Sequence, residues 1–328
     1  MKKLVPSIVV LLLFSILFAA CTAQEEEVEK TDQTAETQRT FRFVMISKVV
    51  HPWFDQVEKG AIAAAERLSE ETGDIVEVEY RAPENADVVQ QNEIIERTIA
   101  TNPDGIFIDL LDPDGNRVLL EEAISRGIPV VIFDSVSPPG MNLTEVNNDF
   151  AEQAAYASER LAEMINYKGK VAIMQGVPTA PNHRIRTESH RAVFAKYPDI
   201  EVVAEGIAND SIEQAQEQAA SILSAHPDLN GFVTSDAAGP IGIGSAIREA
   251  GKAGEVLLIG LEDLPPMIQL MNEGIMQFSA CTKPLMQGQY SVLALWQQAI
   301  GQPSPRVIDT GIGLLTTELA ADPNYVGF

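Results

Sequence analysis

Short apolar runs alternate with amphipathic segments along most of this chain, and this alternation constrains the fold more than any other feature. Each run is rich in Val, Ile, Leu and Phe and has the length of a β-strand. Because the runs are apolar throughout, we expect strands buried on both faces, as in a parallel sheet covered by helices. Strands are predicted at residues 41–46, 75–80, 105–109, 128–133, 171–174, 200–204, 231–234, 256–260 and 275–280.

The segments between these runs carry apolar residues at helical spacing. In residues 53–71, for example, Ala61, Ala64 and Leu68 fall on one side of a helix. The alternation starts afresh after residue 150, which predicts an α/β fold of two doubly wound parallel-sheet domains. Ligands of such sheets bind beyond the carboxyl ends of the strands, so two facing domains form a cleft there. Helices are predicted at residues 53–71, 88–101, 116–126, 151–166, 186–197, 210–224, 235–250, 266–273 and 285–300.

The first residues are typical of a secretory signal. Lysines precede a short apolar stretch that ends in two alanines directly before Cys21. A cysteine at this point indicates a bacterial lipoprotein, with residues 1–20 as signal peptide, 21–39 as an acidic tether and a lipid anchor on Cys21. The protein is then exported and held outside the cytoplasmic membrane, in the periplasm or on the cell surface. Phe18 stands where Leu is usual, and a plain secretory signal or an N-terminal membrane anchor remains the alternative.

The net charge argues against nucleic acid as a partner, and the cysteine content argues against stabilisation by a disulfide. The chain has 23 basic and 47 acidic residues, a net charge of −24, which disfavours binding to nucleic acid. Beyond Cys21 the chain has one cysteine, Cys281, which is expected to be a small buried residue. No disulfide can then form within the body of the chain, so its stability depends on core packing.

Signals of catalysis, metal binding and cofactor binding are weak. The histidines lack metal-binding spacing, and His183 and His190 are expected on a solvated helix face. The glycine-rich stretch 239–244 lacks the spacing of a phosphate-binding loop. We therefore predict no metal, no cofactor and no enzymatic activity. A glycosidase that uses Asp134 and Glu262 is the enzymatic alternative.

Polar and aromatic residues gather where the predicted strands end. Aromatic faces cover the C–H side of a sugar ring, and planar charged side chains each hold several hydroxyls, so this set suits a polyhydroxylated ligand. Strand-end Asp, Ser and Asn residues also commonly cap helices, which is the alternative role for each of them. The predicted ligand-binding residues are Lys48, His51, Trp53, Phe54, Asp134, Arg186, Asn209, Ser235, Glu262 and Thr282.

Several short motifs follow one another in a specific order. They are His51-Pro52-Trp53-Phe54, Asp104-Gly105-Ile106-Phe107-Ile108, Gly127-Ile128-Pro129-Val130-Val131 with Asp134, Asn147-Asn148-Asp149, Arg186, Ser235-Asp236, Gly260-Leu261-Glu262 and Lys283-Pro284. In this order the mature chain resembles the ribose/galactose-type substrate-binding proteins of bacterial ABC sugar importers, which are type I periplasmic binding proteins. Lys48 resembles the first-loop lysine of the branch that includes rhamnose and autoinducer-2 binders.

The resemblance implies two lobes joined by a hinge, residues 40–148 plus 283–308 and residues 149–282 plus 309–328. The crossings would lie near 134–148, 262–283 and 305–311, and the lobes would close over the ligand. It also implies that Asp134 and Arg186 grip ring hydroxyls. The chain departs from the family's usual residues at four positions. Asn209 replaces a usual aromatic residue, Ser235 an Asn, Glu262 an Asp and Thr282 a Gln. These departures put ribose, glucose and galactose themselves in doubt as ligands.

The implied function is the binding, without chemistry, of a small monosaccharide or polyol. The partner is an ABC permease in the membrane, and the protein is expected to be a monomer. Two alternatives use the same fold. Trp53 and Phe54 suit a nucleoside base as well as a sugar, and the closed form could be presented to a chemosensory receptor instead of a permease.

Overall fold

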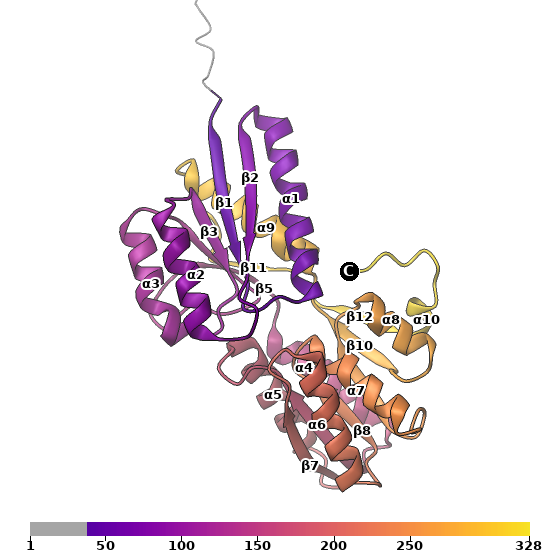
Figure 1. The fold of residues 1–328 in the computed structure, drawn as a ribbon. Helices are drawn as coiled ribbons and strands as arrows, with labels where there is room; N and C mark the ends of the chain where they lie inside the picture. Colours follow the sequence, from indigo (N-terminus) through magenta and orange to yellow (C-terminus); the bar gives the residue numbers. More distant parts are fainter. Residues whose placement is uncertain (1–37) are drawn as a thin grey trace, which may run out of the picture. The chain divides into compact units, whose positions relative to one another are not determined.

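The computed structural model describes residues 38–328, which form one compact unit. This unit contains two six-stranded sheets, each covered by helices (Figure 1). The predicted α/β fold of two doubly wound domains is therefore confirmed. Cys21, the signal segment and most of the tether lie outside the described residues, and the predictions about them stay predictions. None of the helices within 38–328 is long and apolar enough to cross a membrane.

The first sheet is parallel at every strand pair, in the order β11-β5-β4-β3-β1-β2. Helices α1 and α9 cover one face and α2 and α3 the other (Figure 1). Successive residues of β1 alternate between these faces, so Phe43 packs with α1 and Val44 with α2. The elements are β1 (Thr40–Ile46), α1 (Pro52–Thr72), β2 (Ile75–Arg81), α2 (Val88–Ala100), β3 (Gly105–Ile108), α3 (Pro113–Ser125), β4 (Val130–Phe133), β5 (Thr144–Asn147), α9 (Pro284–Ala299) and β11 (Val307–Asp309).

The second sheet has the order β12-β10-β9-β8-β6-β7, and only β12 runs antiparallel within it. Helices α4 and α5 pack on one face, and α6 and α7 on the other. The elements are α4 (Phe150–Met164), β6 (Gly169–Gln175), α5 (Pro181–Phe194), β7 (Ile200–Ile207), α6 (Ile212–Ala225), β8 (Gly231–Thr234), α7 (Ala238–Glu249), β9 (Leu257–Leu261), α8 (Pro265–Asn272), β10 (Phe278–Cys281), β12 (Gly313–Thr316) and α10 (Thr317–Ala320).

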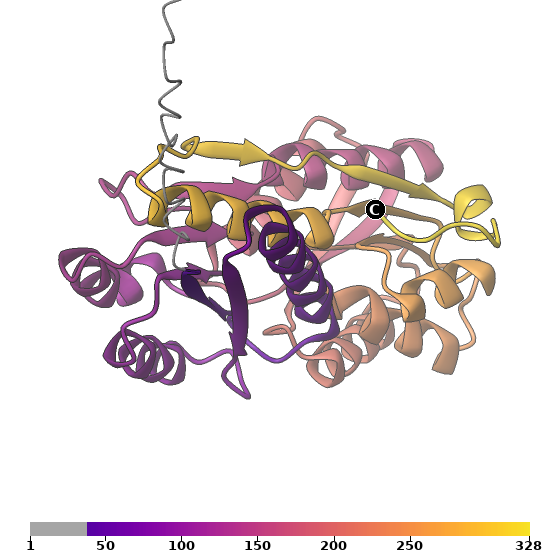
Figure 2. The same cartoon turned by 90° about the horizontal axis from the view of Figure 1, so that it is seen from above.

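Within residues 38–328, the chain passes between the two sheets after β5, after β10 and after β11. Figure 2 shows the last passage, which runs from β11 to β12. We call residues 38–147 and 284–309 the first lobe, and residues 150–281 and 313–328 the second lobe. The predicted bounds placed Asp309 in the second lobe. This is wrong, because Asp309 pairs with Asn147 in the first sheet.

Two glycines hold the late helix α9 against α1 at backbone distance. A Cβ atom on Gly288 would lie 1.9 Å from the carbonyl oxygen of Val57, and one on Gly60 would lie 2.1 Å from that of Leu285. Neither position accepts a side chain without moving a helix. This close packing fixes α9, which follows the second passage, as part of the first lobe.

The structure also corrects two other predictions from sequence. Helix α5 begins at Pro181 rather than at 186, because proline is well suited to the first helical position. His183 and His190 are buried rather than solvated. His190 lies between the Ser158 hydroxyl and the Thr234 carbonyl oxygen, and burial lowers its pKa to about 4. Cys281 is buried in β10, as expected.

Candidate ligand-binding site

The carboxyl ends of strands from both sheets surround one cavity of about 310 Å³, including its opening. Most of the predicted site residues converge here from segments far apart in the sequence. The cavity is lined by Lys48, His51, Trp53, Phe54, Asp134, His183, Arg186, Asp210, Ala237 and Glu262.

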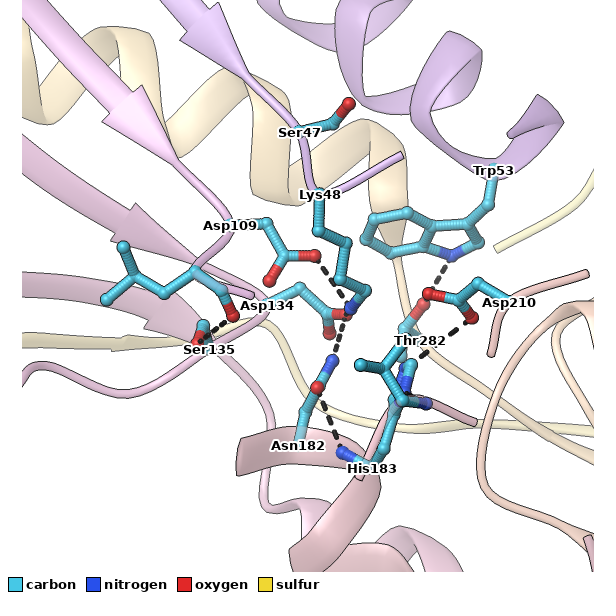
Figure 3. Close-up of polar contacts among 12 residues, drawn as sticks. Ser47, Lys48, Trp53, Asp109, Asp134, Ser135, Asn182, His183, Asp210 and Thr282 are labelled. Atoms are coloured by element: carbon cyan, nitrogen blue, oxygen red, sulfur yellow. Dashed lines mark hydrogen bonds and ion pairs between the residues drawn. The ribbon is translucent and has the colours of Figure 1, made fainter. Parts of the chain in front are cut away.

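A lysine and two aspartates form the first lobe's charged wall (Figure 3). Lys48 follows β1, and its Nζ lies 2.9 Å from Oδ2 of Asp109, which follows β3, and 4.0 Å from Oδ2 of Asp134, which follows β4. All three side chains are buried. Burial lowers the pKa of Lys48, but the charges of Asp109, Asp210 and Asp134 outweigh it, and the pKa is raised overall. The ammonium is therefore firmly protonated.

The aromatic wall comes from the first turn of α1. The Nδ1 atom of the N-cap residue His51 accepts a hydrogen bond from the Trp53 backbone N–H at 3.2 Å, which leaves the proton of the neutral ring on Nε2. Burial lowers the pKa of His51 and favours that neutral ring. Trp53 and Phe54 pack edge to face with centroids 5.1 Å apart. The chain entry into α1 thus positions a donor and two aromatic rings together.

Arg186 and Asn182, both on α5, connect the second lobe to Asp134. Nδ2 of Asn182 donates to Oδ2 of Asp134 at 2.7 Å, and Nη2 of Arg186 lies 3.4 Å from Oδ1 of the same carboxylate. Nε of Arg186 donates to Gln153 Oε1 at 2.9 Å, and the guanidinium lies over the Phe150 ring at 4.9 Å. These contacts hold the guanidinium in one orientation and tie the lobes together across the cavity.

Asp210 and His183 complete the second lobe's side of the cavity (Figure 3). The Val177 backbone N–H donates to Nδ1 of His183 at 2.8 Å, so a neutral ring carries its proton on Nε2, 3.7 Å from Oδ1 of Asp210. Burial lowers the pKa of His183 well below its ordinary range. Asp236 lies behind Asp210, and burial followed by the charge of Asp210 raises its pKa well above the ordinary range.

Glu262 follows β9 and is also fully buried. Its Oε2 accepts from the Thr282 backbone N–H at 3.0 Å and from the Thr282 hydroxyl at 2.6 Å. Burial raises the pKa of Glu262 to about 7, although Arg186 and Thr282 act against that shift. The indole N–H of Trp53 donates to the same threonine hydroxyl at 3.0 Å, which links the first lobe to the second passage.

Backbone strain gathers at this site. Asp134, Asp210 and Glu262 have φ angles of 42°, 56° and 71°, in the left-handed region that side-chain-bearing residues rarely adopt. Each of the three follows a strand and lines the cavity. Such strain persists where the surrounding structure holds it and clusters at functional sites.

Three of the predicted site residues do not line the cavity. Asn209 is exposed and donates to Oε1 of Gln214 at 3.0 Å; its neighbour Asp210 faces the cavity instead. Ser235 is buried against the Thr187 hydroxyl at 2.8 Å. Thr282 supports Glu262 and Trp53 from behind. Asn209 thus has an outer position, and Ser235 and Thr282 have supporting positions, while a role in ligand binding for the three stays a prediction.

The cavity also contains residues that sequence reasoning missed, namely His183, Asp210 and Ala237. His183 precedes Arg186 by three residues and so shares its helix face, which was a usable signal. For Asp210 the sequence marked the right strand end but gave no means to choose between neighbours. Within residues 38–328, no group of His, Cys, Asp and Glu side chains has the arrangement of a metal site.

The model of one family, the periplasmic binding protein domain, matches residues 42–303. The chain therefore belongs to this family. It is 25% identical to the xylose/arabinose-binding protein of Sulfolobus acidocaldarius, over 84% of this chain and 71% of that protein. It is 24% identical to the D-ribose/D-allose-binding protein of Pseudomonas aeruginosa, over 86% of this chain and 91% of that protein.

Solved structures show the same architecture. An ABC transporter solute-binding protein from Burkholderia graminis, in complex with D-arabinose, superposes with a TM-score of 0.80 at 28% identity, over 86% of this chain and 97% of that one. A glucose–galactose-binding protein from Geobacillus stearothermophilus superposes with a TM-score of 0.79 at 26% identity, over 87% of this chain and 100% of that one. The fold and the family thus agree with the resemblance noted from the motifs.

Proposed function

We propose that this protein is the lipid-anchored solute-binding component of an ABC importer and holds a small monosaccharide or polyol in the cavity between its lobes. The observation that carries the proposal is the composition of the cavity wall. Carboxylates, a lysine and an arginine from both lobes lie beside Trp53 and Phe54 in one enclosed space. This combination offers hydrogen bonds to several hydroxyls and an apolar surface to the C–H face of a sugar.

The contacts across the cavity support binding by closure. Asp134 of the first lobe meets Asn182 and Arg186 of the second, and Trp53 reaches Thr282 at a passage between the sheets. The passages are where the backbone can absorb a hinge rotation. Closure of the lobes expels water, which strengthens each polar contact to the ligand and penalises any ligand that leaves a buried group unpaired.

The names of the relatives support a sugar ligand and a membrane permease as the proposed partners. Those reported above bind sugars, and the Burkholderia graminis protein belongs to an ABC transporter. By analogy, the partners proposed here are a sugar or polyol and a membrane permease, and the protein acts as a monomer that releases its ligand unchanged. The nucleoside alternative gains no support from these relatives. The anchor on Cys21 is tested by mass spectrometry of the mature N-terminus, which we expect to carry diacylglycerol.

Calorimetry tests the binding function directly. Residues 38–328 form a compact unit with their own cores, so the protein without residues 1–23 is a suitable sample. We expect one member of a library of monosaccharides and polyols to bind with one-to-one stoichiometry. Nucleosides belong in the same library, because their binding would support the alternative. Failure of every sugar and polyol to bind would contradict the proposal.

Two arginines on α5 provide a matched pair of variants. Arg186 is buried in the cavity wall, whereas Arg184 is exposed and pairs with Glu188 on the surface. We expect Arg186→Ala to abolish detectable binding and Arg184→Ala to leave it unchanged. Thermal unfolding of both variants separates loss of binding from loss of the fold.

A further inference from the structure

The acidic groups in and directly behind the cavity outnumber the cations. Five buried carboxyl groups, those of Asp109, Asp134, Asp210, Asp236 and Glu262, face two cations, Lys48 and Arg186. The cations pair with Asp109 and Asp134. Among the described residues, the other three carboxyl groups have no lysine or arginine nitrogen within 4.0 Å. The second lobe's side of the cavity therefore carries uncompensated acidic groups.

Asp210 is the least satisfied of these groups. Its side chain is 7% exposed, and in the part of the chain that the structure describes no group other than a neighbouring carboxyl donates to its buried Oδ2. Oδ1 lies 3.7 Å from Nε2 of His183, too far for a hydrogen bond, and the burial of His183 keeps that ring neutral. The carboxyl group of Asp236, whose raised pKa keeps its proton, is hydrogen-bonded to Asp210, so the pair carries one negative charge and leaves the side of Asp210 that faces the cavity open to a donor.

His51 presents a second unsatisfied atom to the same space. Its Nδ1 accepts from the Trp53 backbone, so Nε2 carries the proton, and this buried N–H has no partner among the described residues. A ligand that fits must therefore offer an acceptor to His51 and a donor to Asp210. A hydroxyl group can do either, but it brings no positive charge, and Lys48 attracts Asp210 only from beyond 4.0 Å. A buried charge is costly unless a cation or a proton balances it.

We infer that the ligand is a sugar or polyol that carries a protonated amino group, with its ammonium on Asp210 and a hydroxyl oxygen on His51. This inference rests on the proposed function and names its ligand class. The ammonium supplies several N–H donors and one positive charge where the wall has an acidic excess. Hydroxyls of the same ligand contact Lys48, Arg186 and Asp134, as in the proposed sugar complex.

Calorimetry with matched ligand pairs tests the inference. The pairs are D-glucosamine and D-glucose, D-galactosamine and D-galactose, and 1-amino-1-deoxy-D-sorbitol and D-sorbitol, at a slightly acidic pH that keeps each amine protonated. We expect at least one amine to bind about tenfold or more tightly than its neutral parent, the size of one charge-assisted hydrogen bond. Parents that bind as tightly as their amines would overturn the inference and leave the proposed function standing. Failure of both members of every pair, and of the wider sugar library, would contradict the proposed function itself.

The variant Asp210→Asn locates the ammonium. Asparagine adopts a φ of 56° more readily than most residues, so we expect the variant to fold. The loss of affinity should be about tenfold larger for the preferred amine than for its neutral parent, because only the amine loses a charge-assisted contact. Asp228→Asn is the control, because Asp228 is an exposed aspartate of the same lobe that pairs with Lys170. A preference for the amine that survives Asp210→Asn would refute the assignment to Asp210.

Discussion

The two walls of the cavity differ in how their buried carboxylates are balanced by positive charge. In the first lobe, Lys48 and Asp109 compensate each other within the wall, at 2.9 Å. In the second lobe, Asp210 and Glu262 line the cavity with no cation within 4.0 Å among the described residues. The first wall contains the cation for one of its own carboxylates, whereas Asp210 and Glu262 in the second wall depend on protons or a ligand to balance their charge. The first wall should therefore govern stability, and the second should govern ligand choice and the response to pH.

The largest expected effect is on the first wall. Lys48→Met leaves Asp109 buried without its partner, and we expect the free energy of unfolding to fall by about 3–5 kcal/mol. The double variant Lys48→Met/Asp109→Leu removes both charges and should recover most of that loss. Urea unfolding followed by circular dichroism measures each value. A single variant as stable as the parent would show that the pair does not hold this wall.

The next effect is the pH dependence of the free energy of unfolding that Glu262 in the second wall causes. The pKa of Glu262 rises from 4.5 in the ordinary case to about 7 in the folded protein. Between these values the unfolded chain releases the proton and the folded protein keeps it, so the free energy of unfolding should fall as pH rises, by about 3 kcal/mol in total. Glu262→Gln has no such proton and should lack this part of the fall. Urea unfolding of both proteins at pH values below 5 and above 7 checks the difference; parallel profiles would contradict it.

A smaller effect concerns the link between the walls. Trp53→Phe keeps an aromatic ring beside Phe54 but removes the indole N–H that Thr282 accepts at 3.0 Å. A hydrogen bond of this kind contributes about 1 kcal/mol, so we expect ligand affinity to fall by about fivefold to tenfold. Calorimetry with the identified ligand decides the point, and unchanged affinity would mean that this bond is not used in the bound state.

The smallest effect is expected at Asn209, a predicted site residue that does not line the cavity. Asn209 is exposed and has a φ of 50°, which glycine adopts without strain. Asn209→Gly should therefore change ligand affinity by less than about twofold, in contrast to the larger loss expected for Asp210→Asn with an amino ligand. The same titrations compare the two neighbours. A large loss from Asn209→Gly would return this residue to the binding site.

The mainly apolar, buried strands could be predicted from sequence because burial on both faces leaves a clear pattern. Strands β1, β3, β6 and β8 show it, as in Gly231-Phe232-Val233-Thr234. The strands β5, β11 and β12 were not predicted, because they are only partly buried and mix polar with apolar residues, as in Thr144-Glu145-Val146-Asn147. Their pairing depends on partners distant in the chain, such as β10 for β12.

The candidate site could be predicted down to the strand end, but not always to the residue. Lys48, Asp134 and Glu262 lie within two residues of a strand end and line the cavity. At the end of β7, the left-handed backbone of Asn209 and Asp210 decides which side chain turns inward, and no local pattern shows this. The buried position of His183 was missed for a related reason, since it depends on where α5 begins.

A crystal structure with the tightest ligand of the sugar, polyol and amino-sugar library tests the central claim most directly. We expect that ligand to lie between the lobes, with Trp53 on its apolar face, Arg186 and Asp134 on its hydroxyls and Asp210 on its most basic group. A ligand bound outside this cavity, or bound to residues of a single lobe, would contradict the account.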